Sequence, residues 1–448
     1  MNLQPHRLSR EMFAALAAGG GTKSAVTALA DVEYSKRLLL LRAVVEQSAR
    51  SGHPAAAEAA RGFQVLSGLQ EEAPAAVDTV LRYPSTGAWA QRTVRGLLSH
   101  GAARSSGAAP GRLEALAAAA AIRASVRITV EVTAEDGALS LPSLGTADLP
   151  PGRAVVRVSG DGAEITTGGR TVRVPADPHT DAPGWRGLRR LTARSCGRRL
   201  DLLVDDLDPY RMPTMDNLTD RLDPREIRTW AEAFGPAWEM LVRNHATVAG
   251  EIGAGLRVLT PLSPPGHGQV SASARDTIGC AAMSTPPSAR AMAVTLAHEI
   301  QHGKLAMLLE LVDLTRPDDG SRYYTSWRDD PRPASGLLQG AYAYLGVTGF
   351  WLRQRAHETG TAAMEAHSEF ARWRAAADLV TRTLLSSGRL TEEGTAFVTG
   401  MRRTLHGWAD QQVPAAATAL ARRDEEDHRA RWRHRNGEIR LPFVAGLP

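Results

Sequence analysis

Apolar residues recur at helical spacing through the first quarter of the chain. The leucine run at 38–41 predicts a buried helix, and residues 55–69 and 75–81 predict two further helices joined by short polar turns. Three consecutive glycines at 19–21 indicate a break between helices. We therefore expect residues 1–125 to form a helical N-terminal region with a structural role. The alternative is that this region binds a partner protein or a peptide leader.

The period of the pattern changes at Val126. Apolar residues over 126–132 alternate with polar ones, as in a half-buried strand, and the alternation returns over 156–174 between glycine-rich turns. Strands can continue through 200–204, which leads into an acidic turn. This pattern predicts a β-rich subdomain over residues 126–222.

Helical periodicity resumes at Asp223. Trp230, Phe234 and Trp238 lie at helical spacing, and such an aromatic stripe is typical of a core-facing helix. Short strands are expected within 255–261 and 269–283. A strand beside a functional helix is also a place where an extended peptide can add its own backbone to the sheet.

The remainder of the chain is expected to be mainly helical, and we assign a catalytic region to residues 223–448. Its expected helices span about 287–313, 336–356, 358–386, 391–406 and 414–434. The pattern as a whole predicts an α+β fold that is predominantly α-helical.

Composition narrows the class of protein. The chain has 448 residues, of which 43% are hydrophobic and 23% are charged, as in a soluble globular protein of two or three domains. The net charge is +5, but arginines are interleaved with acids, so we expect no nucleic-acid partner. With only Cys196 and Cys280, a disulfide framework or a clustered iron–sulfur site is excluded. The apolar runs at 12–18 and 115–121 are too short to cross a bilayer, so we expect a cytoplasmic protein without a membrane partner.

The strongest candidate for chemistry is the HExxH motif at residues 298–302. Residues four apart on a helix differ by about 40° in direction, so His298 and His302 project from one face and can hold one metal ion. Glu299 lies where a metallopeptidase places the carboxylate that activates water. The surrounding helix is apolar on nearly every face, where polar side chains are costly unless they are paired or bind a metal. The alternative is a structural role, in which the two histidines are core residues whose ring nitrogens are satisfied by hydrogen bonds.

A zinc peptidase requires a third protein ligand, and the local sequence does not provide the usual one. Leu305 and Leu308 occupy the positions of the glycine and the last histidine in HExxHxxGxxH. Glutamates that could serve instead are Glu358, Glu365 and Glu369.

The same two histidines with one further oxygen ligand would also form a facial triad for iron(II), with positions open for a 2-oxo acid and dioxygen. Such a site needs a cation for the distal carboxylate of 2-oxoglutarate, and arginine suits it because its planar fork binds carboxylates with two hydrogen bonds. The loop over 322–333 carries arginines among aromatic and polar residues, although an ordinary surface loop with Arg–Asp pairs has the same composition.

Several long stretches of the chain resemble one family. They include HEIQHGKLAMLLELVDL and SWRDDPRPASGLLQGAYAYLGVTGFW within 296–351, SASARDTIGCAAMS at 271–284, VDDLDPYR at 204–211 and HRLSREMFAALAAGGG at 6–21. These stretches resemble the HExxH-motif peptide-modification proteins found with ribosomally made peptide natural products. The resemblance covers nearly the whole chain. It implies an iron(II)- and 2-oxoglutarate-dependent peptide β-hydroxylase.

The resemblance assigns roles residue by residue. His298 and His302 would be the iron ligands. The charge and position of Arg328 and Arg332, rather than the resemblance itself, make either of them a candidate for binding 2-oxoglutarate. Glu310 is a candidate third ligand, although on a straight helix it would lie about 12 Å beyond His302. Gln339 falls where some relatives have histidine. Tyr324, in the same arginine-bearing loop, is a further site candidate.

Three functions therefore remain open from the sequence. The first is hydroxylation of a β-carbon in a precursor peptide, with Glu299 orienting the site rather than acting as a base. Because the chain lacks a cysteine cluster, any radical-SAM maturase would be a separate partner protein. The second is a zinc metallopeptidase that matures such a peptide, and the third is a scaffold that only binds a peptide leader.

Overall fold

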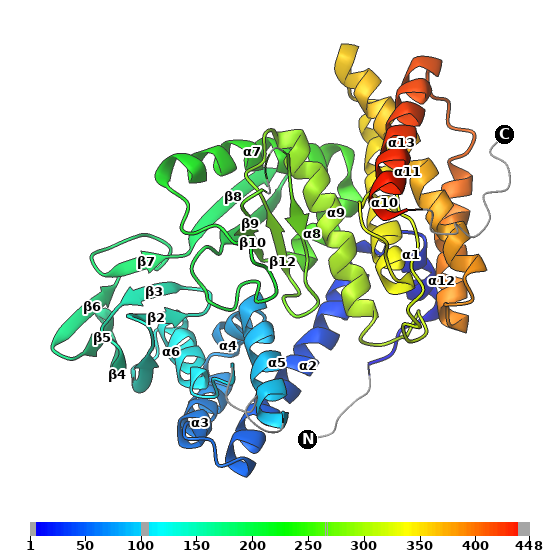
Figure 1. Cartoon of the computed structure of the whole chain (residues 1–448). Helices are drawn as coiled ribbons and strands as arrows, with labels where there is room; N and C mark the ends of the chain where they lie inside the picture. Colours follow the sequence, from blue (N-terminus) through cyan, green and yellow to red (C-terminus); the bar gives the residue numbers. More distant parts are fainter. Residues whose placement is uncertain (1–5, 100–106, 265, 267, 438–448) are drawn as a thin grey trace.

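The computed structural model describes residues 6–99, 107–264, 266 and 268–437. Within these residues the chain forms thirteen helices and twelve strands, which confirms the predicted α+β, mainly helical fold. In Figure 1 the antiparallel strands of the middle of the chain lie at the left end, most of the N-terminal helices (blue) lie at the bottom, and the C-terminal helices (yellow to red) lie at the right. The expected regions 1–125 and 223–448 extend into residues 1–5, 100–106, 265, 267 and 438–448, which lie outside the described residues.

Six helices precede the first strand, in agreement with the predicted helical N-terminal region. They are α1 (Arg10–Ala17), α2 (Thr22–Arg50), α3 (Ala56–Glu72), α4 (Pro74–Leu81), α5 (Pro84–Leu98) and α6 (Arg112–Ala124). The leucine run in α2 is only partly buried, which corrects one prediction. Leu38 and Leu39 are 42% and 60% exposed, whereas Leu41 is 3% exposed. Four consecutive residues span a full helical turn, so they cannot all face one core.

The strands of the middle region form two antiparallel sheets. Four strands are ordered β1-β4-β5-β6 and three are ordered β2-β3-β7. Their bounds are β1 (Ile128–Ala134), β2 (Ala138–Leu141), β3 (Gly145–Asp148), β4 (Gly152–Ser159), β5 (Gly162–Thr167), β6 (Arg170–Val174) and β7 (Trp185–Gly187). Helix α6 packs against β1, and one hydrophobic cluster contains buried residues of α3–α6 and of both sheets. Part of the N-terminal region and part of the β-rich region, from Leu41 to Trp185, therefore share a core.

A third sheet joins this region to the HExxH helix. It has the order β11-β12-β10-β9-β8, and β10 runs parallel to both β9 and β12. The strands are β8 (Arg189–Ser195), β9 (Arg198–Val204), β10 (Val258–Pro261), β11 (Ser271–Ala272) and β12 (Cys280–Met283). Helices α7 (Pro224–Asn244) and α8 (Ala246–Gly255) lie between β9 and β10 in the chain. Trp230, Phe234 and Trp238 of α7 are buried, as the sequence predicted.

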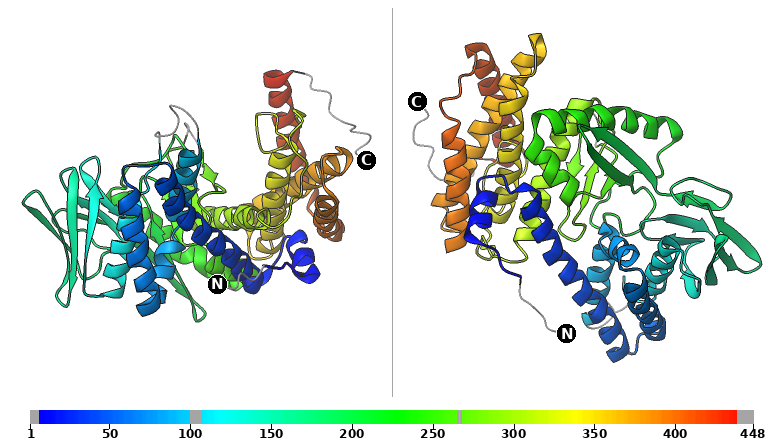
Figure 2. Two further views of the ribbon diagram at one scale, coloured as in Figure 1. Left: turned by 90° about the horizontal axis from the view of Figure 1, so that it is seen from below. Right: turned by 180° about the vertical axis from the view of Figure 1, so that it is seen from behind.

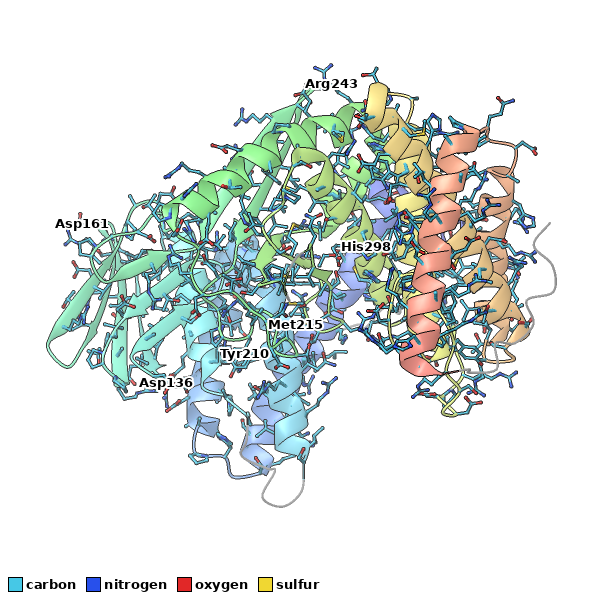
Figure 3. All side chains as sticks on the ribbon, turned by 45° about the horizontal axis from the view of Figure 1, so that its top comes forward. Asp136, Asp161, Tyr210, Met215, Arg243 and His298 are labelled. Atoms are coloured by element: carbon cyan, nitrogen blue, oxygen red, sulfur yellow. The ribbon has the colours of Figure 1, made fainter. Side chains whose placement is uncertain are left out.

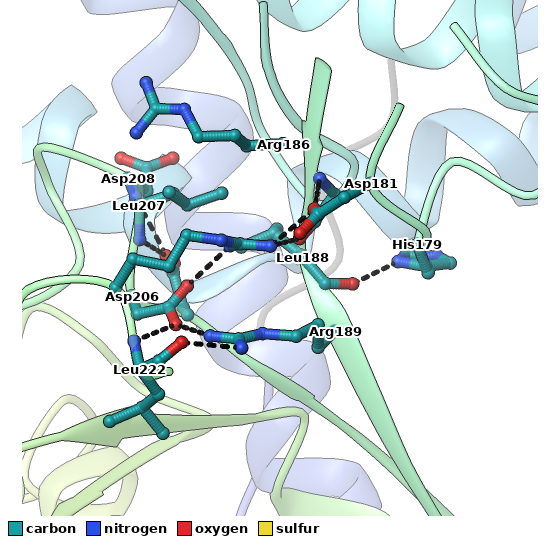
Figure 4. Close-up of polar contacts among 12 residues, drawn as sticks. His179, Asp181, Arg186, Leu188, Arg189, Asp206, Leu207, Asp208 and Leu222 are labelled. Carbon is teal, nitrogen blue, oxygen red and sulfur yellow. Dashed lines mark hydrogen bonds and ion pairs between the residues drawn. The ribbon is translucent and has the colours of Figure 1, made fainter. Parts of the chain in front are cut away.

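The acidic turn after β9 binds the neighbouring elements through buried carboxylates (Figure 4). Asp206 accepts hydrogen bonds from Arg189, from the Leu222 amide at 3.0 Å and from Arg221 Nη1 at 3.1 Å. Arg221 Nη2 also donates to Asp181 Oδ1 at 2.6 Å. Because these partners satisfy the buried charge, the turn has a structural role.

The C-terminal helices complete the fold. They are α9 (Ala289–Leu308), α10 (Ala334–Gln354), α11 (Gly360–Ser386), α12 (Glu392–Gly407) and α13 (Ala415–Asn436). Helix α9 packs against α7 and α10, and α10 packs against α11. In Figures 1 and 2, α9 lies between the third sheet and the C-terminal helices. The predicted helices agree with these bounds to within a few residues, except that α9 ends at Leu308 instead of 313.

Candidate functional site

The HExxH motif lies in the second half of α9. The helix begins after Ser288, whose Oγ accepts a hydrogen bond from the Ala291 amide at 3.1 Å. Because the motif is followed by almost two further turns of helix, its backbone is held by regular helical hydrogen bonds. Figure 3 places His298 between the elements drawn in green and the C-terminal helices. His298 therefore lies at the junction of the sheet and the helical region.

The two imidazoles converge on each other. His298 Nε2 and His302 Nε2 are 3.0 Å apart, with the ring centroids 4.7 Å apart. His302 Nδ1 lies 3.3 Å from Gln339 Oε1, and since an amide oxygen only accepts, Nδ1 carries the proton and Nε2 offers its lone pair. Burial lowers the pKa of His298 to about 4, so this ring is neutral near pH 7. Two imidazoles whose Nε2 atoms converge are suitable donors for one cation.

Glu299 lines the same cavity as the two histidines and is 1% exposed. Ser273, in the segment after β11, donates a hydrogen bond to Glu299 Oε2. The second oxygen, Oε1, lies 3.9 Å from His298 Nε2 and has no hydrogen-bond partner among the described residues. A buried carboxylate oxygen without a partner is costly, and a cation or a water beside His298 would satisfy it.

The histidine pair opens into a cavity of about 830 Å³ between α9, α10, α11 and the β11–β12 segment. Aromatic rings form part of its wall. Tyr344 stacks on Trp327 at a centroid distance of 4.7 Å and contacts Trp373 at 4.2 Å and His298 at 5.2 Å. Burial raises the pKa of Tyr344, so its hydroxyl stays protonated at neutral pH. A cavity of this size and character suits a small molecule or a few residues of a peptide.

Glycine is required where α10 meets Trp327. A Cβ atom on Gly340 would lie 2.4 Å from Trp327 Nε1, which is closer than any side chain allows. The small residue therefore lets the indole pack directly on the helix backbone. This contact positions the loop that carries Arg328.

Both arginines proposed for 2-oxoglutarate line the same cavity as the histidines. Arg328 Nε and Arg332 Nη1 each lie 3.0 Å from a carboxylate oxygen of Asp330. The side chain of Arg328 is 56% exposed and that of Arg332 is 37% exposed. Each guanidinium therefore keeps further N–H groups for a carboxylate in the cavity. Their role in binding 2-oxoglutarate stays a prediction.

Two other predicted site residues lie away from the histidines. Glu310 follows the end of α9, and its Oε1 lies 3.1 Å from Lys36 Nζ and 3.5 Å from Arg275 Nη2. The Tyr324 hydroxyl donates to Glu425 Oε1 at 3.0 Å and also lies 3.0 Å from His428 Nδ1, both on α13. Glu310 and Tyr324 are absent from the cavity lining. The fold gives each of them ion-pair or hydrogen-bond partners of its own.

In the part of the chain that the structure describes, no group of three His, Cys, Asp or Glu side chains could hold a metal ion. Glu358 and Glu365 lie beside Arg290, at 3.7 Å and 2.5 Å. Glu369 of α11 lines the cavity but accepts a hydrogen bond from Trp373 Nε1 at 2.6 Å, and burial raises its pKa. Two imidazoles, with the unpartnered Glu299 oxygen close by, are the donors that the described residues offer to a cation at this site. Imidazole is a good ligand for both iron and zinc.

Sequence reasoning overlooked three cavity residues, Ser273, Tyr344 and Trp373. The only available signal for Ser273 was indirect, since a buried Glu299 needs a donor. Tyr344 and Trp373 come from two different helices, and their approach to His298 depends on how those helices pack.

No protein-family model matches the chain, and no curated protein matches it. Of the helices in the described residues, none is both long and apolar enough to cross a membrane.

Proposed function

We propose that the chain is a non-haem iron(II)- and 2-oxoglutarate-dependent oxygenase that hydroxylates a β-carbon of a residue in a ribosomally made precursor peptide. One observation carries the proposal. The Nε2 atoms of His298 and His302 converge to 3.0 Å in the wall of a cavity that Arg328 and Arg332 also line. Two imidazoles that can donate to a metal and two guanidinium groups that can bind a carboxylate, all in one cavity, support this proposal.

Each residue has a defined task in this proposal. His298 and His302 would hold the metal, and Gln339 would fix the ring orientation of His302 through its Nδ1. Arg328 or Arg332 would bind the distal carboxylate of 2-oxoglutarate, while the aromatic wall would limit the access of water. Iron(II), when bound, would supply the chemistry that activates dioxygen, with succinate as the co-product from 2-oxoglutarate. Glu299 would orient the site through its contact with Ser273.

The first test measures metal binding. Metal-stripped protein is titrated with iron(II) under anaerobic conditions, and the variants His298→Ala and His302→Ala are compared with His434→Ala, which removes an exposed histidine of α13. Removing a residue that only hydrogen-bonds to a metal ligand typically weakens metal binding by roughly 10- to 100-fold. Removing a ligand itself should therefore lower the affinity by at least about 100-fold. Equal affinity in all four proteins would rule out this site.

The second test measures the reaction. Protein, iron(II), 2-oxoglutarate and the peptide encoded beside the gene are mixed in air, and peptide mass and succinate are followed together. We expect a mass gain of one oxygen atom that depends on 2-oxoglutarate and is lost in His298→Ala. Cleaved peptide without any need for 2-oxoglutarate would contradict the proposal.

A zinc metallopeptidase that matures the peptide is the second candidate, and the geometry of Glu299 favours it. The free Oε1 lies 3.9 Å from His298 Nε2, on the side where a general base would accept a proton from water. In this case Glu299→Gln would abolish cleavage while zinc remained bound. In the oxygenase, Glu299→Gln would keep its hydrogen bond with Ser273 and retain hydroxylation.

A further inference from the structure

A second cavity, of about 600 Å³, lies between α2, α4, α8 and the strands β8 and β9. None of the residues that form its wall belongs to the wall of the cavity at the histidine pair. Five cationic side chains line it, namely Lys23, Arg82, Arg123, Arg190 and Arg257. It is therefore a separate site with its own chemistry.

The acidic side chains of this cavity are already engaged. Asp31 and Asp78 each lie 2.9 Å from a nitrogen of Arg82. Asp201 lies 2.6 Å from Arg199 Nε and also accepts a hydrogen bond from Thr192. The direct ion pairs of these acids are thus made with Arg82 and Arg199, and the other cations of the wall feel their charge only at longer range.

Four cations of the wall have no carboxylate within ion-pair distance among the described residues. They are Lys23, Arg123, Arg190 and Arg257. Arg123 is fixed by Ser143, to which its Nε and Nη2 donate at 2.8 Å and 2.5 Å. Arg257 uses Nη1 on the Leu256 carbonyl at 2.8 Å, so its other nitrogens remain available. The Arg190 side chain makes no hydrogen bond to the described residues, although its backbone belongs to the β8–β9 ladder.

The positive groups are close enough to affect one another. Burial lowers the pKa of Arg123, and the charge of Arg190 lowers it further. Burial also lowers the pKa of His179, with further contributions from Arg190 and Arg123. Since arginine remains charged under all ordinary conditions, crowded guanidinium groups of this kind favour an anion between them.

We propose that this cavity binds a small anion that carries at least two carboxylate or phosphate groups. Each free guanidinium edge can form paired hydrogen bonds with a carboxylate or a phosphate, and Arg123 and Arg257 are already held in place by their other contacts. The volume suits a small molecule. The proposal is independent of the function assigned to the histidine pair.

The experiment is calorimetric titration of the full-length protein at low ionic strength with pyrophosphate and, separately, with citrate. We expect saturable binding of at least one probe, weakened by added salt. Arg190→Gln and Arg257→Gln should each weaken it by about tenfold or more, because each removes a charged hydrogen-bond donor. The matched control is Arg194→Gln, an exposed arginine of the same strand β8 that lies outside the cavity wall.

Each outcome decides the proposal. Binding of pyrophosphate alone identifies a phosphate ligand, and binding of citrate alone identifies a polycarboxylate, and either supports the site. No saturable binding of either probe overturns it, as does equal weakening by Arg194→Gln. Melting temperatures without ligand should be similar for Arg190→Gln and Arg194→Gln, since both residues are exposed and neither side chain has a partner among the described residues to lose, whereas Arg257→Gln also loses the hydrogen bond to the Leu256 carbonyl.

Discussion

At the scale of single residues, the state of His302 depends on one hydrogen bond from another helix. Gln339 of α10 accepts from Nδ1, so the lone pair of His302 lies on Nε2, toward His298. The motif alone specifies two rings on one helix face but leaves their tautomers undetermined. Gln339, which is remote in sequence, determines the tautomer of His302.

We expect Gln339→Ala to weaken metal binding by about tenfold or more without abolishing it. The physical reason is that His302 would lose its orienting acceptor while keeping its Nε2 lone pair. Anaerobic titration of iron(II) or zinc measures the change, with Gln412→Ala, an exposed glutamine far from the site, as the control. Unchanged affinity in Gln339→Ala would mean that this hydrogen bond does not orient the ligand.

A second residue predicts a dependence of stability on pH. His245 is 2% exposed, stacks on Phe350 at 4.1 Å and lies 3.0 Å from Gln354 Oε1 through its Nε2. Burial lowers its pKa to about 4, below the value of about 6.5 that it has in the unfolded chain. Between these values the unfolded state binds more protons, so the free energy of unfolding falls as the pH is lowered from about 6.5 toward 4.

The low pKa of His245 is expected to reduce the free energy of unfolding by about 2 kcal/mol at pH 5. It is measured by urea unfolding at several pH values for the wild-type protein and for His245→Asn. The variant cannot titrate here, so its stability should depend less on pH over this range. Parallel pH profiles for the two proteins would exclude the effect.

At the scale of elements, α9 presents different chemistry on different faces. His298 and His302 line the cavity, whereas Gln301 and Lys304 face the glycine break at 19–21. Lys304 Nζ donates to Glu251 Oε2 at 2.9 Å and to the Gly20 carbonyl at 3.0 Å. This face of the motif helix therefore holds the segment between α1 and α2 in place.

We expect Lys304→Met to lower the free energy of unfolding by about 3–5 kcal/mol, because Glu251 would remain buried without its cation. The double variant Lys304→Met/Glu251→Gln should recover much of that loss, since it removes both charges. Chemical denaturation measures both effects, and Lys23→Met, on an exposed lysine, should change stability by less than about 0.5 kcal/mol. A double variant no more stable than Lys304→Met would show that the loss comes from packing.

At the scale of the whole molecule, the boundary expected near residue 125 does not separate two cores. Helix α6 packs against β1, and the buried alanines at 115–121 belong to the same cluster as Ile165 and Val156. The alternation of residues correctly indicated strands after Val126. It contained no information on what covers their inner faces.

This shared core predicts coupled stability. Ile165→Ala in β5, where the side chain is 0% exposed, should cost about 2–5 kcal/mol. Hydrogen exchange should accelerate in α6 as well as in the strands, and Leu39→Ala, at a 60% exposed position, should leave both unchanged. If exchange in α6 did not respond, the helical and β-rich regions would be independent folding units.

The sequence by itself determined the helices, most of the strands and the histidine pair, because these depend on local periodicity and on residues one turn apart. It could not show that Leu38 and Leu39 are exposed, or that Glu310 pairs with Lys36. Only the tertiary structure brought Gln339, Ser273, Tyr344 and the two loop arginines around His298 and His302. The physical reason is that such contacts depend on how distant elements pack, and no local pattern in the chain encodes that packing.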